Sequence, residues 1–466
     1  HDMAFLRTSP HSFTHAKGSI PLETSRSNEK PPRSVPTYST KSLTGFPLRL
    51  CSGLTLRQFD KLTTSKAQGK TLEKGFTLVE LLIVIGILAI LSVAVVVVLN
   101  PAELIKQSRD SSRMSDFAAI STAMSLYTID QPGGFTGSSS IVYVSIPDTS
   151  NTCANLGLPT LPTGYSYACS STSTYRKVDG TGWMPLSLSS MATGAPFSVL
   201  PIDPVNTTSS GNYYTYTPSG QKYEVATPFE SAKYKLGGSA DRASMDGGIY
   251  TGLYESGSSL TLAPIDYGDP SLVGYWTFNE GTGTKVYDYS GHNASGTWQG
   301  TLGSQWTGGK VGAYAGNFNG TDNSVAIQYR NIGETLTYSL WTNVATTSVQ
   351  IVFSFMNTAL RINSGNLATT FFPNVTAGTT YSANYTFTIG TWYHIVVTQT
   401  GSTIATYING TSLGSQTVQP VSTGSTSNAI GSYANASFAN DIIDDVRIYN
   451  RALSASEILA LYNATK

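Results

Sequence analysis

The sequence contains little cysteine and little charge. Only 3 of its 466 residues are Cys, and 12% are Asp, Glu, Lys or Arg, about half of the usual share. Three cysteines allow at most one disulfide with one thiol left over, which excludes a disulfide-stapled scaffold and a Cys-rich zinc protein. Lys plus Arg (28) equal Asp plus Glu (28), so neither a basic nucleic-acid binder nor an acidic disordered chain is expected.

Groups that could carry catalysis are also scarce. After residue 75 the chain has two histidines, His292 and His394, and neither belongs to a Ser-His-Asp pattern. His394 lies in an apolar run, where a hydrogen-bonded core histidine is the simpler interpretation. A glycoside hydrolase needs two carboxylates about 5 to 9.5 Å apart, but Glu280, Glu334 and Glu457 are isolated and no zinc spacing or phosphate loop occurs. We therefore expect that the protein is not an enzyme.

The chain is long and rich in small polar residues and tyrosine. Its 466 residues suffice for two or three domains, and its Ser, Thr, Gly, Asn and Tyr content is typical of secreted β-rich surface proteins. Residues 1–75 hold 12 Lys and Arg against 5 Asp and Glu, a net of +7, so residues 76–466 hold 16 against 23, a net of −7. Binding through broad attraction to anionic polymers is thus not expected of the second part.

A long apolar run follows the basic part. Leu81–Leu99 has no charge, and as a helix it would be about 28 Å long, which matches a bilayer core. Lys70 and Lys74 precede it, which predicts a single transmembrane helix with its N-terminal side in the cytoplasm. A cleaved secretory signal would need a shorter apolar core and a small-residue cleavage site, and neither is present.

Glu80 lies at the edge of this run, where a carboxylate costs about 2.5 to 3.5 kcal/mol to insert and so requires a partner. Together with Gly75, Phe76 and the apolar run, Glu80 forms a pattern that resembles the N-terminal methylation signature of type IV pilins. Type II secretion pseudopilins share this signature. The resemblance implies that a prepilin peptidase cleaves between Gly75 and Phe76 and that the new Phe76 amine is methylated. It also implies that Glu80 pairs with the Phe76 ammonium of a neighbouring subunit. A plain anchor with an incidental glutamate is the alternative.

The helix is predicted to continue beyond the run. Asn100 and Pro101 should kink it, because proline lacks an N–H. From Glu103 to Ile129, apolar residues recur at spacings of three and four, as in an amphipathic stalk helix that packs on a small sheet. These residues are Leu104, Ile105, Phe117, Ile120, Met124 and Tyr127. The Gln-Pro-Gly-Gly run at 131–134 should end the helix.

Residues 1–74 differ from the short leaders of pilins. They are rich in Ser, Thr, Pro and basic residues, show no hydrophobic periodicity, and are predicted to be disordered. Because His1 and Asp2 precede Met3, an over-extended start is favoured over a functional cytoplasmic tail. Cys51 would be a reduced thiol there.

Residues 131–265 are predicted to form a small α+β domain. Alternating Tyr and Thr near its centre indicate short antiparallel strands. Cys153 and Cys169 are separated by 15 residues. In an exported protein, a disulfide between them would contribute about 3 kcal/mol.

An Asp-Pro pair at 203–204 resembles the Asp-Pro loop of major pseudopilins, where a neighbouring loop holds calcium. In this chain the later acidic loop is reduced to Asp241 and Asp246. A turn closed by a local hydrogen bond is therefore the favoured interpretation.

A short linker is expected at 266–270, and the pattern changes after it. The Trp-Thr-Phe-Asn-Glu-Gly sequence at 276–281 and the run from Ile443 to Ser454 resemble a laminin-G-like, concanavalin-type domain. The resemblance covers residues 271–464 and implies a two-sheet jelly-roll sandwich.

Two local signals agree with this resemblance. Asn409-Gly410 is a strong signal for a tight hairpin turn. Ser454 and Glu457 form a capping box ahead of a terminal helix.

Many members of this family hold calcium, and the resemblance makes Asp288, Asn293, Asp444 and Asp445 the candidate oxygen donors for Ca²⁺. The equally weighted alternative is that Asp444 and Asp445 cap backbone amides or pair with Arg447.

Four aromatic residues could stack on sugar rings, although core positions are the favoured interpretation. They are Trp298, Trp306, Trp341 and Tyr433. The ligand-binding residues are otherwise unknown.

The predicted fold class is α+β multi-domain: a long N-terminal pilin helix with a small antiparallel sheet domain, followed by an all-β concanavalin-like jelly-roll sandwich. In chain order, the parts are the leader 1–75, the transmembrane and stalk helix 76–130, the pilin-like globular domain 131–265, the linker 266–270 and the laminin-G-like domain 271–466.

The leading hypothesis is a minor-pilin-type subunit of a type IV pilus or pilus-like filament. Its laminin-G-like module would serve adhesion or glycan or protein recognition. The alternatives are a type II secretion pseudopilin and, less favoured, a filament-borne glycosidase. Expected partners are other pilin subunits, the prepilin peptidase, the inner-membrane assembly platform and an extracellular glycan or protein, but not nucleic acid. The chain would lie in the cytoplasmic membrane before assembly and in an extracellular filament afterwards.

Overall fold

The computed structural model describes residues 76–466 except 136, 329–331, 356–357, 364–365, 372–378, 418–427 and 434–436. The predicted leader, with Cys51 and the cleavage-site residue Gly75, therefore lies outside the described residues. Residues 76–466 form one compact unit.

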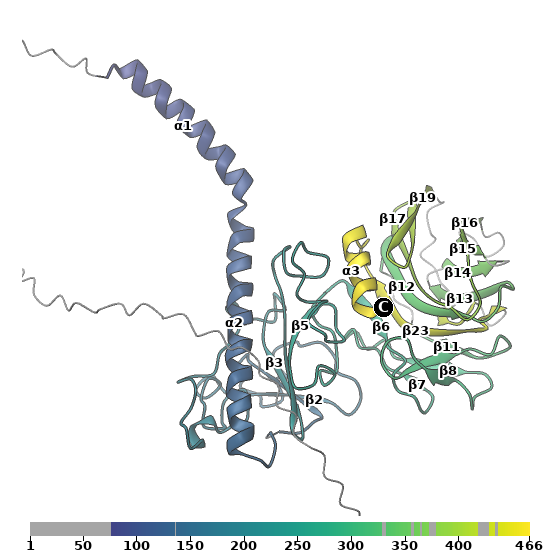
Figure 1. Cartoon of the computed structure of the whole chain (residues 1–466), viewed down its shortest axis with the longest axis horizontal. Helices are drawn as coiled ribbons and strands as arrows, with labels where there is room; N and C mark the ends of the chain where they lie inside the picture. The colour runs from purple at the N-terminus through teal and green to yellow at the C-terminus, as the bar shows by residue number, and fades with distance from the viewer. Residues whose placement is uncertain are drawn as a thin grey trace, which may run out of the picture. The chain divides into compact units, whose positions relative to one another are not determined.

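Two successive helices begin this unit (Figure 1). They are α1, Leu78–Leu99, and α2, Pro101–Asp130. Asn100 interrupts them as predicted: its φ of 40° is left-handed, and its side chain accepts a hydrogen bond from the Glu103 amide at 3.4 Å. Among the residues that the structure describes, no helix combines the length and the apolarity needed to cross a membrane. The predicted span Leu81–Leu99 ends in six residues whose side chains lie outside the described part.

The later turns of α2 pack on the sheet of the middle domain. The buried apolar residues of this face include Phe117, Ile120, Met124 and Tyr127. They join one core with Trp183 and Tyr214, so the predicted stripe is confirmed from Phe117 onward. Leu104 and Ile105 are instead 50% and 56% exposed, because the sheet lies against the later turns of the helix (Figure 1).

The middle domain contains a five-stranded sheet in the order β2-β1-β3-β4-β5. Its strands are β1 (Ile141–Val144), β2 (Ser166–Cys169), β3 (Thr215–Ser219), β4 (Lys222–Pro228) and β5 (Leu253–Gly257). A short 3₁₀ helix, η1, spans Leu188–Ser190. The sheet is mixed rather than purely antiparallel as predicted, since β1 and β2 run parallel. The long connection 145–165 permits this, because parallel strands cannot be joined by a tight turn.

The C-terminal part is a sandwich of two eight-stranded sheets, as predicted for a jelly roll. The first sheet has the order β19-β18-β17-β12-β23-β10-β9, with β6 also paired to β23. Its strands are β6 (Leu272–Trp276), β9 (Trp306–Gly308), β10 (Tyr314–Asn317), β12 (Thr335–Val344), β17 (Trp392–Thr400), β18 (Thr403–Ile408), β19 (Thr411–Thr417) and β23 (Asp441–Tyr449).

The second sheet has the order β16-β15-β14-β13-β20-β11-β8-β7. Its strands are β7 (Lys285–Val286), β8 (Gly296–Gln299), β11 (Ser324–Ala326), β13 (Gln350–Phe355), β14 (Thr358–Asn363), β15 (Asn366–Phe371), β16 (Thr379–Thr386) and β20 (Ala429–Ile430). A small ribbon of β21 (Ser432–Tyr433) and β22 (Ser437–Phe438) accompanies it. One apolar core, which includes Trp298, Phe353, Ile395 and Ile443, takes residues from both sheets.

Both local signals in the sandwich are confirmed. Asn409 and Gly410 have φ values of 51° and 75°, the left-handed pair that a tight hairpin turn requires between β18 and β19. Helix α3 (Ala455–Thr465) begins with the capping box, in which Ser454 and Glu457 each accept a hydrogen bond from the other's backbone amide.

The segment 266–270, expected as a linker, begins with a buried residue and is hydrogen-bonded to the middle domain. Asp266 is 1% exposed and accepts hydrogen bonds from the amides of Gly252 and Gly268, at 3.1 and 3.0 Å. The ring of Tyr267 stacks on that of Tyr213, with centroids 4.8 Å apart. The middle domain and the sandwich are therefore connected by an ordered segment.

The two domains also share a small apolar core. It joins Tyr250 and Leu253 of the middle domain to Tyr275 and Leu461 of the sandwich. Tyr250 and Tyr275 meet edge to face, with ring centroids 6.3 Å apart. Apolar burial of this kind stabilises the contact between the domains.

Candidate functional site

The predicted assembly residues lie at the start of α1. Phe76 is 79% exposed, and Thr77 caps the helix. The Glu80 carboxylate accepts hydrogen bonds from the amide and the hydroxyl of Thr77, both at 2.9 Å. This capping box was not among the predicted features, although its T-x-x-E spacing signals it. Pairing of Glu80 with the Phe76 amine of another subunit stays a prediction.

Apart from Glu80, the described side chains of α1, up to Val93, form an almost entirely apolar surface. Every large apolar side chain described in this helix is exposed, from 80% for Leu78 to 43% for Val84. Such a continuous apolar surface is unfavourable in water and marks an interaction site. The chemistry of α1 therefore fits lipid or other apolar helices as its surroundings.

A buried ion network holds α2 on the middle domain. The Arg113 guanidinium donates from Nε to Asp203 Oδ2 at 2.6 Å and from Nη2 to Asp203 Oδ1 at 2.9 Å. It also donates to Asp110 at 2.7 Å and to Glu230 at 2.6 Å. In addition, Asp203 accepts the backbone amide of Val205 at 2.8 Å. The Asp-Pro segment thus forms the expected turn and anchors the stalk helix.

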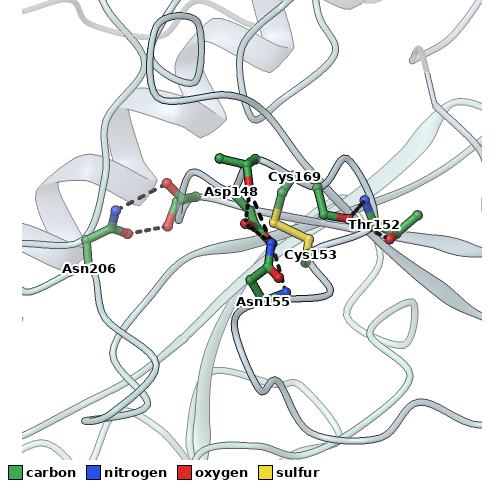
Figure 2. Close-up of a disulfide and its surroundings, with 9 residues drawn as sticks. Asp148, Thr152, Cys153, Asn155, Cys169 and Asn206 are labelled. Atoms are coloured by element: carbon green, nitrogen blue, oxygen red, sulfur yellow. Dashed lines mark hydrogen bonds between the residues drawn. A yellow bond between two sulfur atoms is a disulfide. The ribbon is translucent and has the colours of Figure 1, made fainter.

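Cys153 and Cys169 form a disulfide, with their Cα atoms 5.3 Å apart (Figure 2). Beside it, Asp148 accepts hydrogen bonds from the amide and the side chain of Asn155, at 3.1 and 2.9 Å. The loop that the disulfide closes reaches the sandwich, where the Thr160 amide donates to the Gly291 carbonyl at 3.0 Å.

The oxygens of the first candidate calcium ligand are already used within the fold. Asp288 Oδ1 accepts the amides of Tyr275 and Ser290, at 3.0 and 2.9 Å, and its Oδ2 accepts that of Ala294 at 2.8 Å. Asn293 lies in the same loop with a left-handed φ of 56°. These bonds shape the loop after β7.

The contacts of Asp444 and Asp445 fit the alternative interpretation, in which these residues cap backbone amides or pair with Arg447. Asp444 accepts the amides of Lys310 and Val311 at 2.8 and 2.9 Å, and burial raises its pKa to about 8. Asp445 pairs with Arg447 at 3.0 Å.

The four candidate residues therefore do not fit a calcium site. Within the described residues, no three acidic, histidine or cysteine side chains come together as metal ligands. Calcium prefers several hard oxygens that are free to converge on it, whereas these carboxylates are turned to backbone amides and to an arginine. Calcium binding by the set Asp288, Asn293, Asp444 and Asp445 stays an untested prediction, and the hydrogen bonds of its three aspartates do not support it.

The aromatic candidates are mainly core residues, as favoured from the sequence. Trp298 and Trp341 are 3% and 2% exposed, and Trp341 Nε1 donates to the Thr465 hydroxyl at 3.0 Å. His394 is fully buried, and its Nε2 lies 2.9 Å from the Ser339 hydroxyl. Desolvation lowers the pKa of His394 to about 3, so it is a neutral core histidine.

Two cavities lie where the middle domain meets the sandwich. The larger, about 850 Å³, has Lys106, Lys235, His292 and Arg451 among its lining residues. Its Arg451 donates to Asp269 at 2.7 Å and to Glu457 at 3.0 Å. The guanidinium of Arg451 is therefore already ion-paired with the carboxylates of Asp269 and Glu457.

The smaller cavity, about 420 Å³, is lined by Tyr165 of the disulfide loop and by Glu280, Tyr287 and Tyr289 of the sandwich. In the sequence Glu280 is an isolated glutamate, and no local pattern marks these tyrosines. Their proximity arises from the docking of the two domains, which has no local sequence signal.

Family models match two separate parts of the chain. Residues 70–96 match the prokaryotic N-terminal methylation motif, and residues 319–459 match the laminin-G type of the concanavalin A-like lectin/glucanases superfamily. No match was found among curated proteins.

Solved structures similar to the chain include two toxin domains. One is the receptor-binding domain of botulinum neurotoxin C/D mosaic serotype, at 15% identity and a TM-score of 0.34, with 41% of this chain and 51% of that chain covered. Another is the binding domain of Paraclostridial mosquitocidal protein 1, at 20% identity and a TM-score of 0.35, with 42% and 52% covered. The chain thus spans about half the length of these structures. Likenesses at this level say nothing about what this chain binds.

The two family matches point to a protein that assembles and binds. The chain carries a pilin-type N-terminal methylation motif and, at its C-terminal end, a laminin-G-like, concanavalin-type domain.

Proposed function

We propose that the chain is a minor-pilin-type subunit of a type IV pilus or pilus-like filament, and that its laminin-G-like domain is an extracellular binding module. The observation that carries the proposal is the methylation motif at 70–96, placed directly before and within an apolar helix with exposed side chains. Cleavage before Phe76 would leave this helix at the N-terminus. It would lie in the membrane first and among the helices of other subunits after assembly.

The construction of the chain supports an outward-facing binding role for the sandwich. The Arg113 network and the buried face of α2 attach the stalk firmly to the middle domain. The Arg447 guanidinium of the sandwich in turn donates to the Thr251 hydroxyl of the middle domain at 2.8 Å. A module held in this way would follow its stalk into the filament.

The test is to locate the chain in native filaments. Antibodies to residues 271–466 should label pili on intact cells, and a deletion strain should lose attachment. Loss of protein secretion with unchanged attachment would favour the pseudopilin alternative. Absence of the chain from every filament would contradict both.

A further inference from the structure

Two buried glutamates lie side by side on the five-stranded sheet of the middle domain. In the antiparallel ladder, Glu224 of β4 is opposite Gly257, and Glu255 of β5 is opposite Ala226. The glutamates are therefore diagonal neighbours on one face of the sheet. They are 1% and 2% exposed, and their side chains are hydrogen-bonded to each other. Because an ionised carboxylate only accepts hydrogen bonds, this contact requires a proton on one of the two.

Backbone amides occupy the other oxygens of the pair. Glu224 Oε2 accepts the amides of Leu262 and Ala263, at 2.6 and 3.0 Å. Glu255 Oε2 accepts the Tyr250 amide at 2.9 Å. The two Oε1 atoms are buried, and no donor among the described residues reaches them. A proton held between the glutamates satisfies both atoms, which would otherwise be costly unpaired acceptors.

The loop before β5 adds negative charge beside the pair. The two oxygens of Asp246 accept the amides of Glu255 and Gly248, at 2.5 and 2.9 Å. Tyr250 also faces the pair, and burial raises its pKa well above the ordinary value, so that it stays neutral. A nearby carboxylate disfavours a second negative charge. The loop therefore favours retention of the shared proton.

Neither glutamate has an ion pair with a lysine or arginine of the described residues. Arg447 reaches the Thr251 hydroxyl from the sandwich at 2.8 Å, but it is paired with Asp445. In the described part of the chain, no three metal-binding side chains come together. The two free Oε1 atoms are also too few for calcium, which takes six to eight oxygens. The contacts thus favour a proton over a cation.

The pair lies next to the apolar core that the middle domain shares with the sandwich. Ala226 and Leu253 belong to this core, and each lies two residues from one of the glutamates along its strand. Tyr250 and Ala263 belong to it as well, and their amides donate to the pair. The residues that the middle domain buries in the shared core are therefore positioned by the two glutamates.

We propose that Glu224 and Glu255 form a pH-sensitive lock on the docking of the sandwich. With the bridging proton in place, the pair holds the Tyr250 and Ala263 backbone, and the shared core stays closed. When hydroxide removes the proton, the O–H bond breaks, water forms, and two adjacent carboxylates with a charge of −2 remain. Their repulsion and their need for water separate the side chains and release the shared core.

The direction of the pH dependence follows from burial, which raises the pKa of both glutamates, that of Glu255 well above its ordinary value. The lock is fully present below the ordinary pKa of glutamate and is lost as pH rises through the raised pKa of the pair. This inference concerns the domain junction and does not depend on the proposed filament role.

Infrared spectroscopy of the full chain in detergent tests for the shared proton, because a protonated carboxyl has a carbonyl band that a carboxylate lacks. As pH rises from 6 to 9.5, the pair should keep its band after those of the other buried carboxyls have faded. The others have pKa values raised to about 7 or about 8 and are Asp246, Glu280, Asp441 and Asp444.

The variants Glu224→Gln and Glu255→Gln separate one shared proton from two independent ones. In either variant the glutamine amide can donate to the remaining carboxylate and take the place of the proton. Each single variant should therefore remove the whole band of the pair. Asp441→Asn, which replaces a buried carboxyl of the sandwich, should leave this band in place.

Docking is measured as the distance between spin labels at Ser189→Cys and Ser415→Cys, two exposed positions in the middle domain and the sandwich, with Cys51→Ser in the same chain. The scan ends at pH 9.5, below the ordinary pKa of tyrosine. The distance distribution should broaden in the alkaline part of the scan while circular dichroism shows that both domains stay folded. In the two glutamine variants, broadening should shift upward by about one pH unit or more, or disappear. Asp441→Asn should broaden as the parent does.

Several results would overturn the lock. The first is the absence of a pair band at every pH, and the second is a band that only half disappears in each glutamine variant. Broadening at the same pH in the parent and the glutamine variants would also refute it, as would a parent whose distances never change. A band that appears only after calcium is removed with EDTA would show that a metal ion takes the place of the proton.

Discussion

Arg113 of the stalk helix and Asp203 of the middle domain form a bidentate ion pair, and both side chains are completely buried. The pair connects α2 to a loop far from it in the sequence. Because each charge has lost its water, each depends on its partner.

Replacing Arg113 with methionine should destabilise the middle domain by about 3 to 5 kcal/mol, because Asp110 and Asp203 would remain as buried carboxylates without their cation. Urea denaturation of the detergent-solubilised chain measures this. Arg109→Met is the matched control. It removes a partly exposed arginine that pairs with Glu230, and it should cost no more than about 1 kcal/mol. Equal effects of the two variants would contradict the role given to the buried pair.

Loss of the disulfide should cost about 3 kcal/mol, since it closes a loop of 15 residues. The double variant Cys153→Ser with Cys169→Ser should therefore melt at a lower temperature than the parent. Added dithiothreitol should lower the melting temperature of the parent and leave the double variant unchanged. A parent insensitive to reductant under unfolding conditions would speak against a stabilising bridge.

Stability should fall as pH rises from 6.5 to 8. Burial raises the pKa of Asp246, Glu280 and Asp441 to about 7 and that of Asp444 to about 8. The folded chain therefore keeps protons that the unfolded chain has already released, and this advantage is lost as pH approaches each folded pKa. His394, with its pKa lowered to about 3, acts in the opposite direction but only below its ordinary value of 6.5.

The expected loss over this interval is on the order of 1 kcal/mol or more. It is measured as the free energy of unfolding in urea at pH 6.5, 7.25 and 8. Asp444→Asn should flatten the upper part of the profile, whereas Glu334→Gln, at an exposed position, should not alter it. A stability that rises with pH across this interval is the opposite of what burial requires.

Glu80→Val should leave membrane insertion intact and impair filament assembly. The substitution removes the carboxylate proposed to pair with the Phe76 amine of a neighbour, while it makes insertion of the helix easier. Membrane fractionation and the amount of chain in sheared filaments give the two readouts. Glu334→Val removes an exposed carboxylate of the sandwich and serves as the control. Normal incorporation of the Glu80 variant would end the pairing argument.

Local patterns predicted much of the fold, because their causes are local. The helical period placed Phe117 in a core, and the capping box placed the start of α3. The same period also included Leu104 and Ile105, which are exposed because burial depends on how far the sheet extends along the helix. The parallel pairing of β1 and β2 likewise depends on the path of a long connection.

The candidate sites were less predictable, since one residue type serves several purposes. The sequence does not distinguish an aspartate that caps backbone amides from one that binds calcium. In the structure, the bonds from the Lys310 and Val311 amides identify Asp444 as a residue that caps backbone amides. The approach of Tyr165 to the cavity that Glu280 lines is a product of domain docking. The methylation motif was recognisable because its residues are adjacent in the chain.

The most direct test of the filament assignment is the N-terminus of the chain recovered from sheared, purified filaments. Mass spectrometry should find a chain that begins at Phe76 and carries a methyl group on its amine. A filament-borne chain that retains residues before Phe76, or filaments that contain no fragment of this chain, would contradict the account.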